Sequence, residues 1–178
     1  MYFKKVKGIK TAEYLLWCSM KSRCRVQYEN CTISDNFMNF QYFAEWCQHQ
    51  VGFKVAGFQL DKDILAGDCL EYNENTCVFV PRKLNCFITT YYSNTKSGVI
   101  FIAKLNKFRA RIQDLDGKRI HLGLFQTEAE AFSAYKTAKE NLCKQLAEKY
   151  NNCVDGRVLT RLRELEIKSV NKPRSLDK

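Results

Sequence analysis

The sequence predicts an α+β protein of two small modules, and three observations support this fold class. Residues 58–90 read as a strand, a loop, a second strand and a short helix. Residues 98–150 read as three short antiparallel strands followed by one long amphipathic helix. A polar run between these patterns is typical of a linker. We expect four segments: a strand–strand–helix module over 1–90, a linker at 91–97, a three-stranded sheet packed on a long helix over 98–150, and a C-terminal helix and tail over 151–178.

Two amphipathic helices are expected ahead of the first strand pair. Thr11 is a suitable N-cap for a helix over 11–21. Residues 37–50 predict a second helix, because apolar side chains recur there at helical spacing. Its buried stripe should comprise Phe37, Phe40, Phe43, Ala44 and Cys47. The polar stretch between the two helices, 22–35, predicts a loop.

The composition points to a polyanionic partner. The chain of 178 residues has a formal net charge of +10, which divides into +2 over residues 1–85 and +8 over 86–178. A net charge this basic is typical of proteins that bind nucleic acid. The nine cysteines form no C-x-x-C pair and no export signal is visible, so we expect reduced, mostly buried thiols. No apolar stretch reaches membrane length, and we expect a cytoplasmic protein without membrane association.

Alternation along two strands of the second module separates basic from apolar side chains. In 107–113, Lys107, Arg109, Arg111 and Gln113 face away from Phe108, Ala110 and Ile112. In 118–125, Arg119 and His121 face away from Ile120, Leu122 and Leu124. Asp116-Gly117 between the strands predicts a tight hairpin.

The helix that follows should cover the apolar face of this sheet. Thr127 and Glu130 have the spacing of a capping box at its start. Its apolar stripe is predicted to be Phe132, Tyr135, Ala138, Leu142 and Leu146. The basic face would then remain free. A β-ribbon fits the major groove of double-stranded DNA, where arginine can read guanine. The alternative is a set of ordinary solvated charges.

Residues 98–142 resemble the DNA-binding domain of plant ethylene-response factors, which also occurs in phage and homing endonucleases. The shared motifs are G-V, K-x-R-A-x-I, G-K-x-x-x-L-G-x-F-x-T and A-x-x-A-Y. The resemblance implies a three-stranded sheet that reads the major groove and packs on one helix. It implies base contacts from Arg109, Arg111, Arg119 and His121, supported by Lys104, Lys107 and Lys118. The first strand departs from the plant pattern at Ile100, Phe101 and Ile102, so base contacts from it are not implied.

The first module carries oxygen-bearing side chains around its strand pair. Asp61 and Asp63 lie two residues apart on the expected first strand, Asn75 precedes the second strand and Asn85 follows it. Carboxylate and amide oxygens suit Mg²⁺, which can polarise a phosphodiester. The same residue types are also common in turns, so both interpretations stay open.

Residues 13–85 resemble the N-terminal part of phage HNH-type homing endonucleases in a degenerate form. The matching segments are EYLLWCSMKSRC, YENCTISDNFMNFQYFAEW, LDKDIL and YNENTCVFVPRKLN. The resemblance implies one Mg²⁺ or Mn²⁺ held by Asp61 and Asn85, with Asn75 as a brace and Lys62 at the general-base position. Lys62 is a departure, because the family has histidine there and lysine at its ordinary pKa is charged at pH 7.

These resemblances lead to a first functional expectation and two alternatives. The first is a phage or mobile-element DNA endonuclease or nickase, acting as a monomer on double-stranded DNA in the bacterial cytoplasm. The second is a catalytically inactive derivative that regulates a locus by binding DNA. The third is an inhibitor of a host or rival factor that uses its basic face against an acidic protein. The cysteine spacings do not match zinc knuckles, so structural zinc is not expected.

Overall fold

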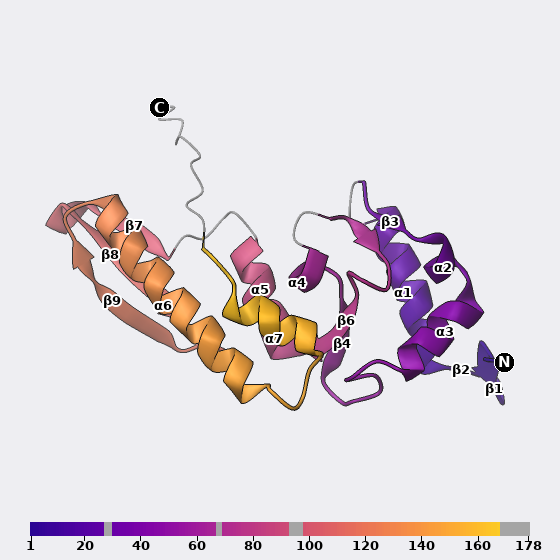
Figure 1. The fold of residues 1–178 in the computed structure, drawn as a ribbon. Helices are drawn as coiled ribbons and strands as arrows, with labels where there is room; N and C mark the ends of the chain where they lie inside the picture. The colour runs from indigo at the N-terminus through magenta and orange to yellow at the C-terminus, as the bar shows by residue number, and fades with distance from the viewer. Residues whose placement is uncertain (27–29, 67–68, 93–97, 168–178) are drawn as a thin grey trace. The chain divides into compact units, whose positions relative to one another are not determined.

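A computed structural model describes residues 1–26, 30–66, 69–92 and 98–167, with 89–92 as backbone only (Figure 1). It confirms an α+β fold that includes a three-stranded antiparallel sheet. The chain divides into two compact units, Met1–Thr89 with Tyr150–Arg161, and Thr90–Lys149 with Leu162–Lys178. Of the expected linker, 91–92 end a helix and 93–97 lie outside the described residues. Within the described part of the chain, no helix has the length and hydropathy to cross a membrane.

The first unit combines short helices with three two-stranded pairings. Its elements are β1 (Lys5–Val6), β2 (Ile9–Lys10), α1 (Ala12–Val26), β3 (Thr32–Ile33), α2 (Asp35–Met38), α3 (Phe40–Gln48), β4 (Phe58–Asp61), α4 (Asp63–Ala66), β5 (Glu71–Tyr72), β6 (Val78–Pro81) and α5 (Arg82–Tyr92). β1 pairs with β2 and β4 with β6, both antiparallel, whereas β3 and β5 are parallel. The helix α7 (Gly156–Arg163) begins in this unit.

The helices of this unit begin at polar caps. The Thr11 side chain accepts a 3.4 Å hydrogen bond from Tyr14 N, which confirms its predicted role at the start of α1. α1 continues to Val26, so the loop predicted from residue 22 begins too early. The second predicted helix is two helices, because the Asn39 side chain accepts hydrogen bonds from Gln41 N and Tyr42 N and starts α3 anew.

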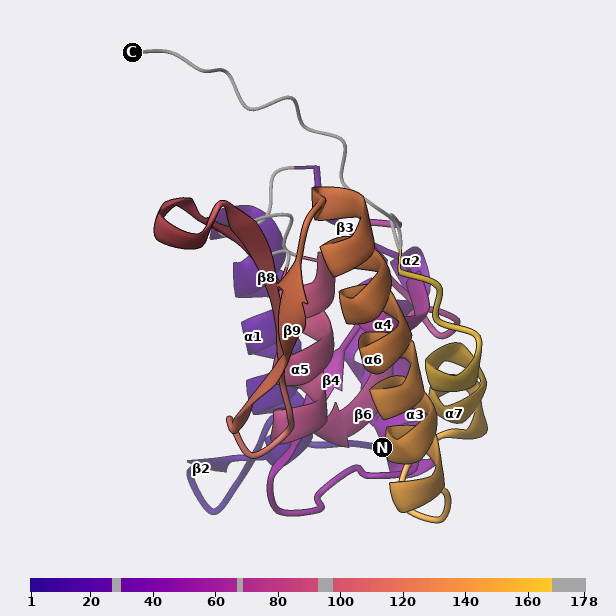
Figure 2. The ribbon, with the colours of Figure 1, turned by 90° about the vertical axis from the view of Figure 1, so that its left-hand side faces the viewer.

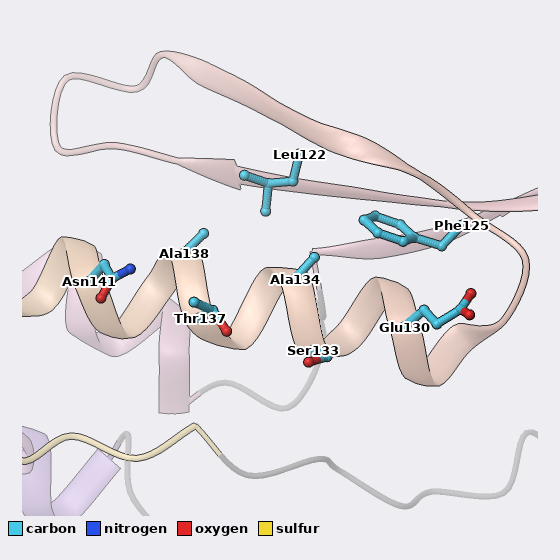
Figure 3. Close-up of a pocket in the computed structure, with 8 residues that line it drawn as sticks. All are labelled: Leu122, Phe125, Glu130, Ser133, Ala134, Thr137, Ala138 and Asn141. Atoms are coloured by element: carbon cyan, nitrogen blue, oxygen red, sulfur yellow. The ribbon is translucent and has the colours of Figure 1, made fainter.

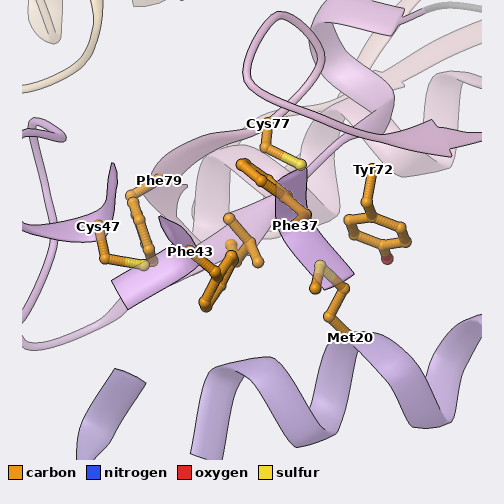
Figure 4. Close-up of a cluster of buried hydrophobic side chains, with 8 residues drawn as sticks. Met20, Phe37, Phe43, Cys47, Tyr72, Cys77 and Phe79 are labelled. Atoms are coloured by element: carbon orange, nitrogen blue, oxygen red, sulfur yellow. The ribbon is translucent and has the colours of Figure 1, made fainter. Parts of the chain in front are cut away.

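An aromatic core holds the first unit together (Figure 4). The predicted stripe of Phe37, Phe40, Phe43, Ala44 and Cys47 is buried throughout. Figure 4 shows Phe37 and Phe43 side by side, with Met20 of α1, Tyr72 of β5 and Phe79 of β6 around them. This cluster fixes β5 and β6, and through the pairing of β6 with β4 it also fixes the position of Asp61.

The second unit is a sheet on a helix. Its elements are β7 (Val99–Ile102), the 3-10 turn η1 (Ala103–Leu105), β8 (Lys107–Gln113), β9 (Arg119–Phe125) and α6 (Glu128–Lys149). The sheet order is β7-β8-β9, and Figures 1 and 2 both show α6 running alongside it. The hairpin predicted at Asp116-Gly117 is present, with Gly117 at φ +82° and its N–H bonded to Asp114 O at 3.1 Å.

The capping box predicted for the long helix is confirmed. Glu130 N donates to Thr127 Oγ1 at 3.2 Å, and Thr127 N donates to Glu130 Oε2 at 3.1 Å. Phe132 and Tyr135 pack against the core of the sheet as predicted, together with Ala131 and Ala134. One face of the sheet is therefore covered by α6, and the other face is open.

A β-bulge changes which side chains of β9 lie on which face. Ala110 pairs with Gly123 but Arg111 pairs with His121, so Leu122 is an extra residue on β9. One inserted residue reverses the alternation beyond it. Leu124 therefore lies opposite Arg109 on the open face, and the prediction that it shares the covered face with Ile120 and Leu122 is wrong.

Candidate nucleic-acid interface

Four rows of side chains cross the open face of the sheet. Read along β8, the rows are Ile102 with Lys107, then Ile100, Arg109 and Leu124, then Arg111 with His121, and finally Gln113 with Arg119. Opposed residues on antiparallel strands lie roughly 5 Å apart at their Cβ atoms. The structure thus brings Lys107, Arg109, Arg111, Arg119 and His121 together on one face, as the alternation predicts. Lys118 lies in the adjoining turn and Lys104 in η1.

This face carries positive charge without compensating carboxylates. Lys104, Lys118, Arg119 and His121 are exposed, and Lys107, Arg109 and Arg111 are half-buried. None of these seven side chains forms an ion pair with a residue that the structure describes. Surface basic residues commonly stand among acidic ones, and this face lacks them. Its potential is therefore positive and available to an anionic ligand.

Asp114, which follows β8 at the edge of this face, is used locally. The Asp114 carboxylate accepts hydrogen bonds from Asp116 N at 3.0 Å and Lys118 N at 2.9 Å, and so it closes the β8–β9 turn. Gln113 Nε2 donates to Gly117 O at 2.9 Å in the same turn. The turn is consequently held by hydrogen bonds among its own polar groups. These hydrogen bonds fix the backbone that carries Lys118 and Arg119 at the end of the sheet.

Three aliphatic members of the open face, Ile100, Ile102 and Leu124, were not predicted from the sequence. Ile100 and Leu124 are 37% and 41% exposed and flank Arg109 from either side. For Leu124 the available signal was Gly123, because a glycine inside a strand often marks a bulge. Its φ of +141° shows that the backbone there takes a conformation suited to glycine.

In the first unit, the side chain of Asp61 accepts a hydrogen bond from the backbone. Asp61 ends β4, is 6% exposed, and its Oδ2 accepts a 2.9 Å hydrogen bond from Ile64 N at the start of α4. The carboxylate therefore caps this short helix. Burial raises the pKa of Asp61 to about 6, although the hydrogen bond from the backbone of Ile64 acts in the opposite direction.

Lys62 is a buried lysine whose ammonium group contacts a carboxylate and an aromatic ring. It is 2% exposed, its Nζ forms an ion pair with Asp63 Oδ1, and the same atom lies 5.6 Å from the centre of the Tyr72 ring. A carboxylate and an aromatic face both stabilise the charged ammonium. An ammonium group has no lone pair with which to accept a proton, so Lys62 would have to lose its proton before it could act at the general-base position.

The two asparagines occupy different settings. Asn75 is exposed, with its backbone N bonded to Asn73 Oδ1 at 2.9 Å and its backbone O accepting from Arg157. Asn85 is half-buried in the first turn of α5. β4 and β6 run so that Phe58 pairs with Pro81 and Asp61 with Val78. Asp61 thus lies beside the start of β6, and Asn85 follows its end.

The side chains around Asp61 are committed to contacts within the protein. One oxygen of Asp61 caps α4, and the neighbouring carboxylate of Asp63 forms an ion pair with Lys62. A metal ligand must be a deprotonated carboxylate, so the raised pKa of Asp61, about 6, would weaken metal binding at acidic pH but not at neutral pH. Across the described ranges, no three His, Cys, Asp or Glu side chains are grouped so that they could hold a metal ion.

The thiols are less buried than the sequence predicts. Cys47, Cys77 and Cys143 are buried, Cys18, Cys24 and Cys31 are half-buried, and Cys69, Cys86 and Cys153 are exposed. The expectation of mostly buried cysteines is therefore wrong, because six of the nine are half-buried or exposed. Cys24 and Cys31 approach each other, with 3.0 Å between their sulfur atoms.

A shallow groove of about 770 Å³ lies between β9 and α6 on the covered side of the sheet (Figure 3). Figure 3 shows Leu122 and Phe125 pointing toward the helix and Ala134 and Ala138 pointing back at the strand. Its one carboxylate, Glu130, belongs to the capping box. The groove thus has small polar and apolar walls without basic groups, unlike the open face.

Comparisons with known proteins leave the family of this chain open. No protein-family model, no curated protein and no solved structure matches it.

Proposed function

We propose that this protein binds double-stranded DNA through the open face of the β7-β8-β9 sheet. The observation that carries the proposal is the set of seven basic side chains on and around this face, none of which has a carboxylate partner among the described residues. A ribbon of strands has the dimensions of the major groove, and arginine can bind the O6 and N7 atoms of guanine together. The lysines at the margins suit phosphate contacts, which set the register on the duplex.

The distribution of charge favours DNA over an acidic protein surface. The basic side chains follow the strands in rows and are accompanied by Gln113, which can read base edges or phosphates. Phosphates border a groove on both sides, so a face with central arginines and marginal lysines matches the duplex. An inhibitor of an acidic protein would bind without DNA, and a binding assay at low salt separates the two hypotheses.

We further propose that the bound DNA is not cleaved and that the protein acts as a DNA-binding regulator. The strand–strand–helix order of β4, β6 and α5 resembles the arrangement expected of an endonuclease. Its chemistry differs, because Asp61 caps α4 and Lys62 is a buried, ion-paired ammonium. This unit then has a structural role, and the open face of the sheet determines where the protein binds.

The test combines selection with a cleavage assay. Duplexes bound by the full chain would be selected from a random-sequence pool, and a supercoiled plasmid carrying the selected site would be incubated with the protein and Mg²⁺ or Mn²⁺. We expect a defined site to be recovered and the plasmid to stay supercoiled. Recovery of no sequence at low salt would overturn the binding proposal. Metal-dependent nicking at the site would overturn the regulator proposal and favour the endonuclease.

A further inference from the structure

One row of the open face combines an arginine with two aliphatic side chains. Arg109 on β8 lies opposite Ile100 on β7 and opposite Leu124 on β9. Neighbouring strands are about 4.8 Å apart, so the three side chains form a short line across the sheet. Leu124 joins this line only because the bulge at Leu122 shifts the alternation of β9.

The two aliphatic side chains are exposed where the sheet is not covered by its helix. Ile100 is 37% exposed and Leu124 is 41% exposed, and neither belongs to the hydrophobic core under α6. Single exposed aliphatic residues are common on protein surfaces. Ile100 and Leu124 flank one arginine, whereas the remaining aliphatic residue of this face, Ile102, lies in the next row opposite Lys107. The row of Arg109 is therefore a mixed surface with a defined order.

The arginine between them is held without using its hydrogen-bonding capacity. Arg109 Nε is covered and has no hydrogen-bond partner, and no described residue forms an ion pair with the side chain. The covered Nε limits the orientations of the guanidinium group, whose terminal nitrogens have no hydrogen-bond partner among the described residues. An arginine restricted in this way loses less side-chain entropy when it binds.

The chemistry of this row corresponds to particular base edges. Guanine offers two acceptors to an arginine in the major groove, and the only apolar group on any base edge there is the C5 methyl of thymine. We propose that Arg109 reads a guanine while Ile100 and Leu124 contact the methyl groups of neighbouring thymines. The inference rests on the proposed binding of duplex DNA and specifies the sequence class, guanine bordered by thymine.

The chain offers a matched control for the aliphatic contacts. Ile120 lies on the same strand as Leu124 and is 40% exposed, but it pairs with Ile112 on the opposite face of the sheet. Ile120→Ala removes a comparable exposed aliphatic side chain without touching the open face. The variants Ile100→Ala and Leu124→Ala remove the proposed methyl contacts one at a time.

The experiment compares thymine with deoxyuridine, which lacks only the C5 methyl. The site selected by the wild-type chain would be synthesised with deoxyuridine at each thymine in turn, and affinities measured by fluorescence anisotropy. Each contacted methyl should contribute about fourfold in affinity, the equivalent of one buried methylene. Ile100→Ala and Leu124→Ala should each abolish the thymine preference at one position, and Ile120→Ala should keep both preferences.

The outcomes distinguish this inference from the function on which it rests. A selected site without thymine beside guanine, or equal affinity of the wild-type chain for thymine and deoxyuridine duplexes, overturns the methyl contacts and leaves DNA binding in place. Failure to bind any duplex overturns both. The wild-type comparison needs no substitution in the protein, so a variant that folds poorly does not affect it.

Discussion

At the scale of single residues, Asp61 can be interpreted in two ways, as a metal ligand or as the cap of a helix. Its position at the end of β4 matches a metal ligand by resemblance, but its Oδ2 atom is bonded to Ile64 N and its carboxyl group is buried. Burial raises its pKa to about 6 from an ordinary value of 3.8. The folded chain therefore holds a proton that the unfolded chain releases at lower pH.

This difference predicts how stability changes with pH. Between about pH 4 and pH 6 the folded state binds more protons at Asp61 than the unfolded state does, so its contribution to stability falls as pH rises through this window. The rise in the pKa of Asp61 from 3.8 to about 6 corresponds to about 3 kcal/mol in the free energy of unfolding. Asp61→Asn keeps an acceptor for Ile64 N and does not titrate. Urea unfolding should therefore show that the free energy of unfolding of Asp61→Asn, relative to that of the wild type, increases by up to this amount from about pH 4 to pH 7.

The same two proteins test whether Asp61 binds metal. A ligand that binds only the folded chain raises its stability. Mg²⁺ should therefore leave the melting temperatures of the wild type and Asp61→Asn unchanged if the carboxylate is only a cap. Stabilisation by Mg²⁺ that disappears in the variant would show that Asp61 is a ligand, and a constant stability difference between pH 4 and pH 7 would contradict the raised pKa.

The arginines of the open face lead to a second prediction at this scale. Arg109→Ala and Arg111→Ala should each weaken binding to the selected site by about 1–3 kcal/mol, or roughly 5- to 150-fold, because each removes a proposed base contact. Arg163→Ala is the matched control. Arg163 lies in the second unit and forms an exposed ion pair with Glu148 at 2.9 Å. Anisotropy titrations in which all three variants bind alike would mean that the reading face is misassigned.

At the scale of elements, the bulge in β9 determines the composition of the open face. Alternation in the sequence correctly placed Arg109 and Arg111 on one face, since β8 is regular there. It placed Leu124 on the wrong face, because a bulge depends on local backbone geometry and Gly123 is a weak signal for it. The helical spacing of apolar residues over 37–50 likewise predicted a single helix, but Asn39 separates two helices there. The spacing of the apolar residues continues across Asn39, so it does not reveal the cap.

The site in the first unit was less predictable than the sheet. The strand–strand–helix order follows from local patterns, and the sequence identifies Lys62 as unusual. Its burial, its ion pair with Asp63 and its position over the Tyr72 ring depend on the aromatic core, which is assembled from segments far apart in the chain. Pairwise contacts of this kind leave no periodic trace in the sequence.

A third prediction concerns the start of the sheet. Gly98 precedes β7, and a Cβ atom there would lie 2.1 Å from Arg111 O and 2.4 Å from the Tyr135 ring. Arg111 N also donates to Gly98 O at 2.8 Å, so the two backbones cannot separate without losing a hydrogen bond. Gly98→Ala should therefore destabilise the second unit by more than about 2 kcal/mol, as overpacking in a core does.

The matched control for this substitution is Gly156→Ala. Gly156 begins α7, and a Cβ atom there would meet nothing within 4 Å. Alanine at this position should be neutral or add up to about 1 kcal/mol of stability. Thermal unfolding followed by circular dichroism would compare the two variants. Equal melting temperatures would contradict the close packing of β7 against β8 and α6.

At the scale of the whole molecule, net charge alone does not distinguish a specific DNA-binding face from bulk attraction. The formal charge of +10 includes lysines of the β1–β2 hairpin as well as those of the sheet. Nonspecific binding follows the number of phosphates neutralised, wherever the charges lie. Specific binding should depend on which surface carries them.

The most direct test of the central claim removes equal charge from these two surfaces. One variant combines Arg109→Gln, Arg111→Gln and Arg119→Gln, and the other combines Lys5→Gln, Lys7→Gln and Lys10→Gln, so each lowers the charge by about three units at neutral pH. Affinity for the selected duplex would be measured at one salt concentration. The sheet variant should lose at least about 100-fold and the hairpin variant less than about tenfold. Equal losses in the two variants would contradict DNA reading by the open face of the sheet.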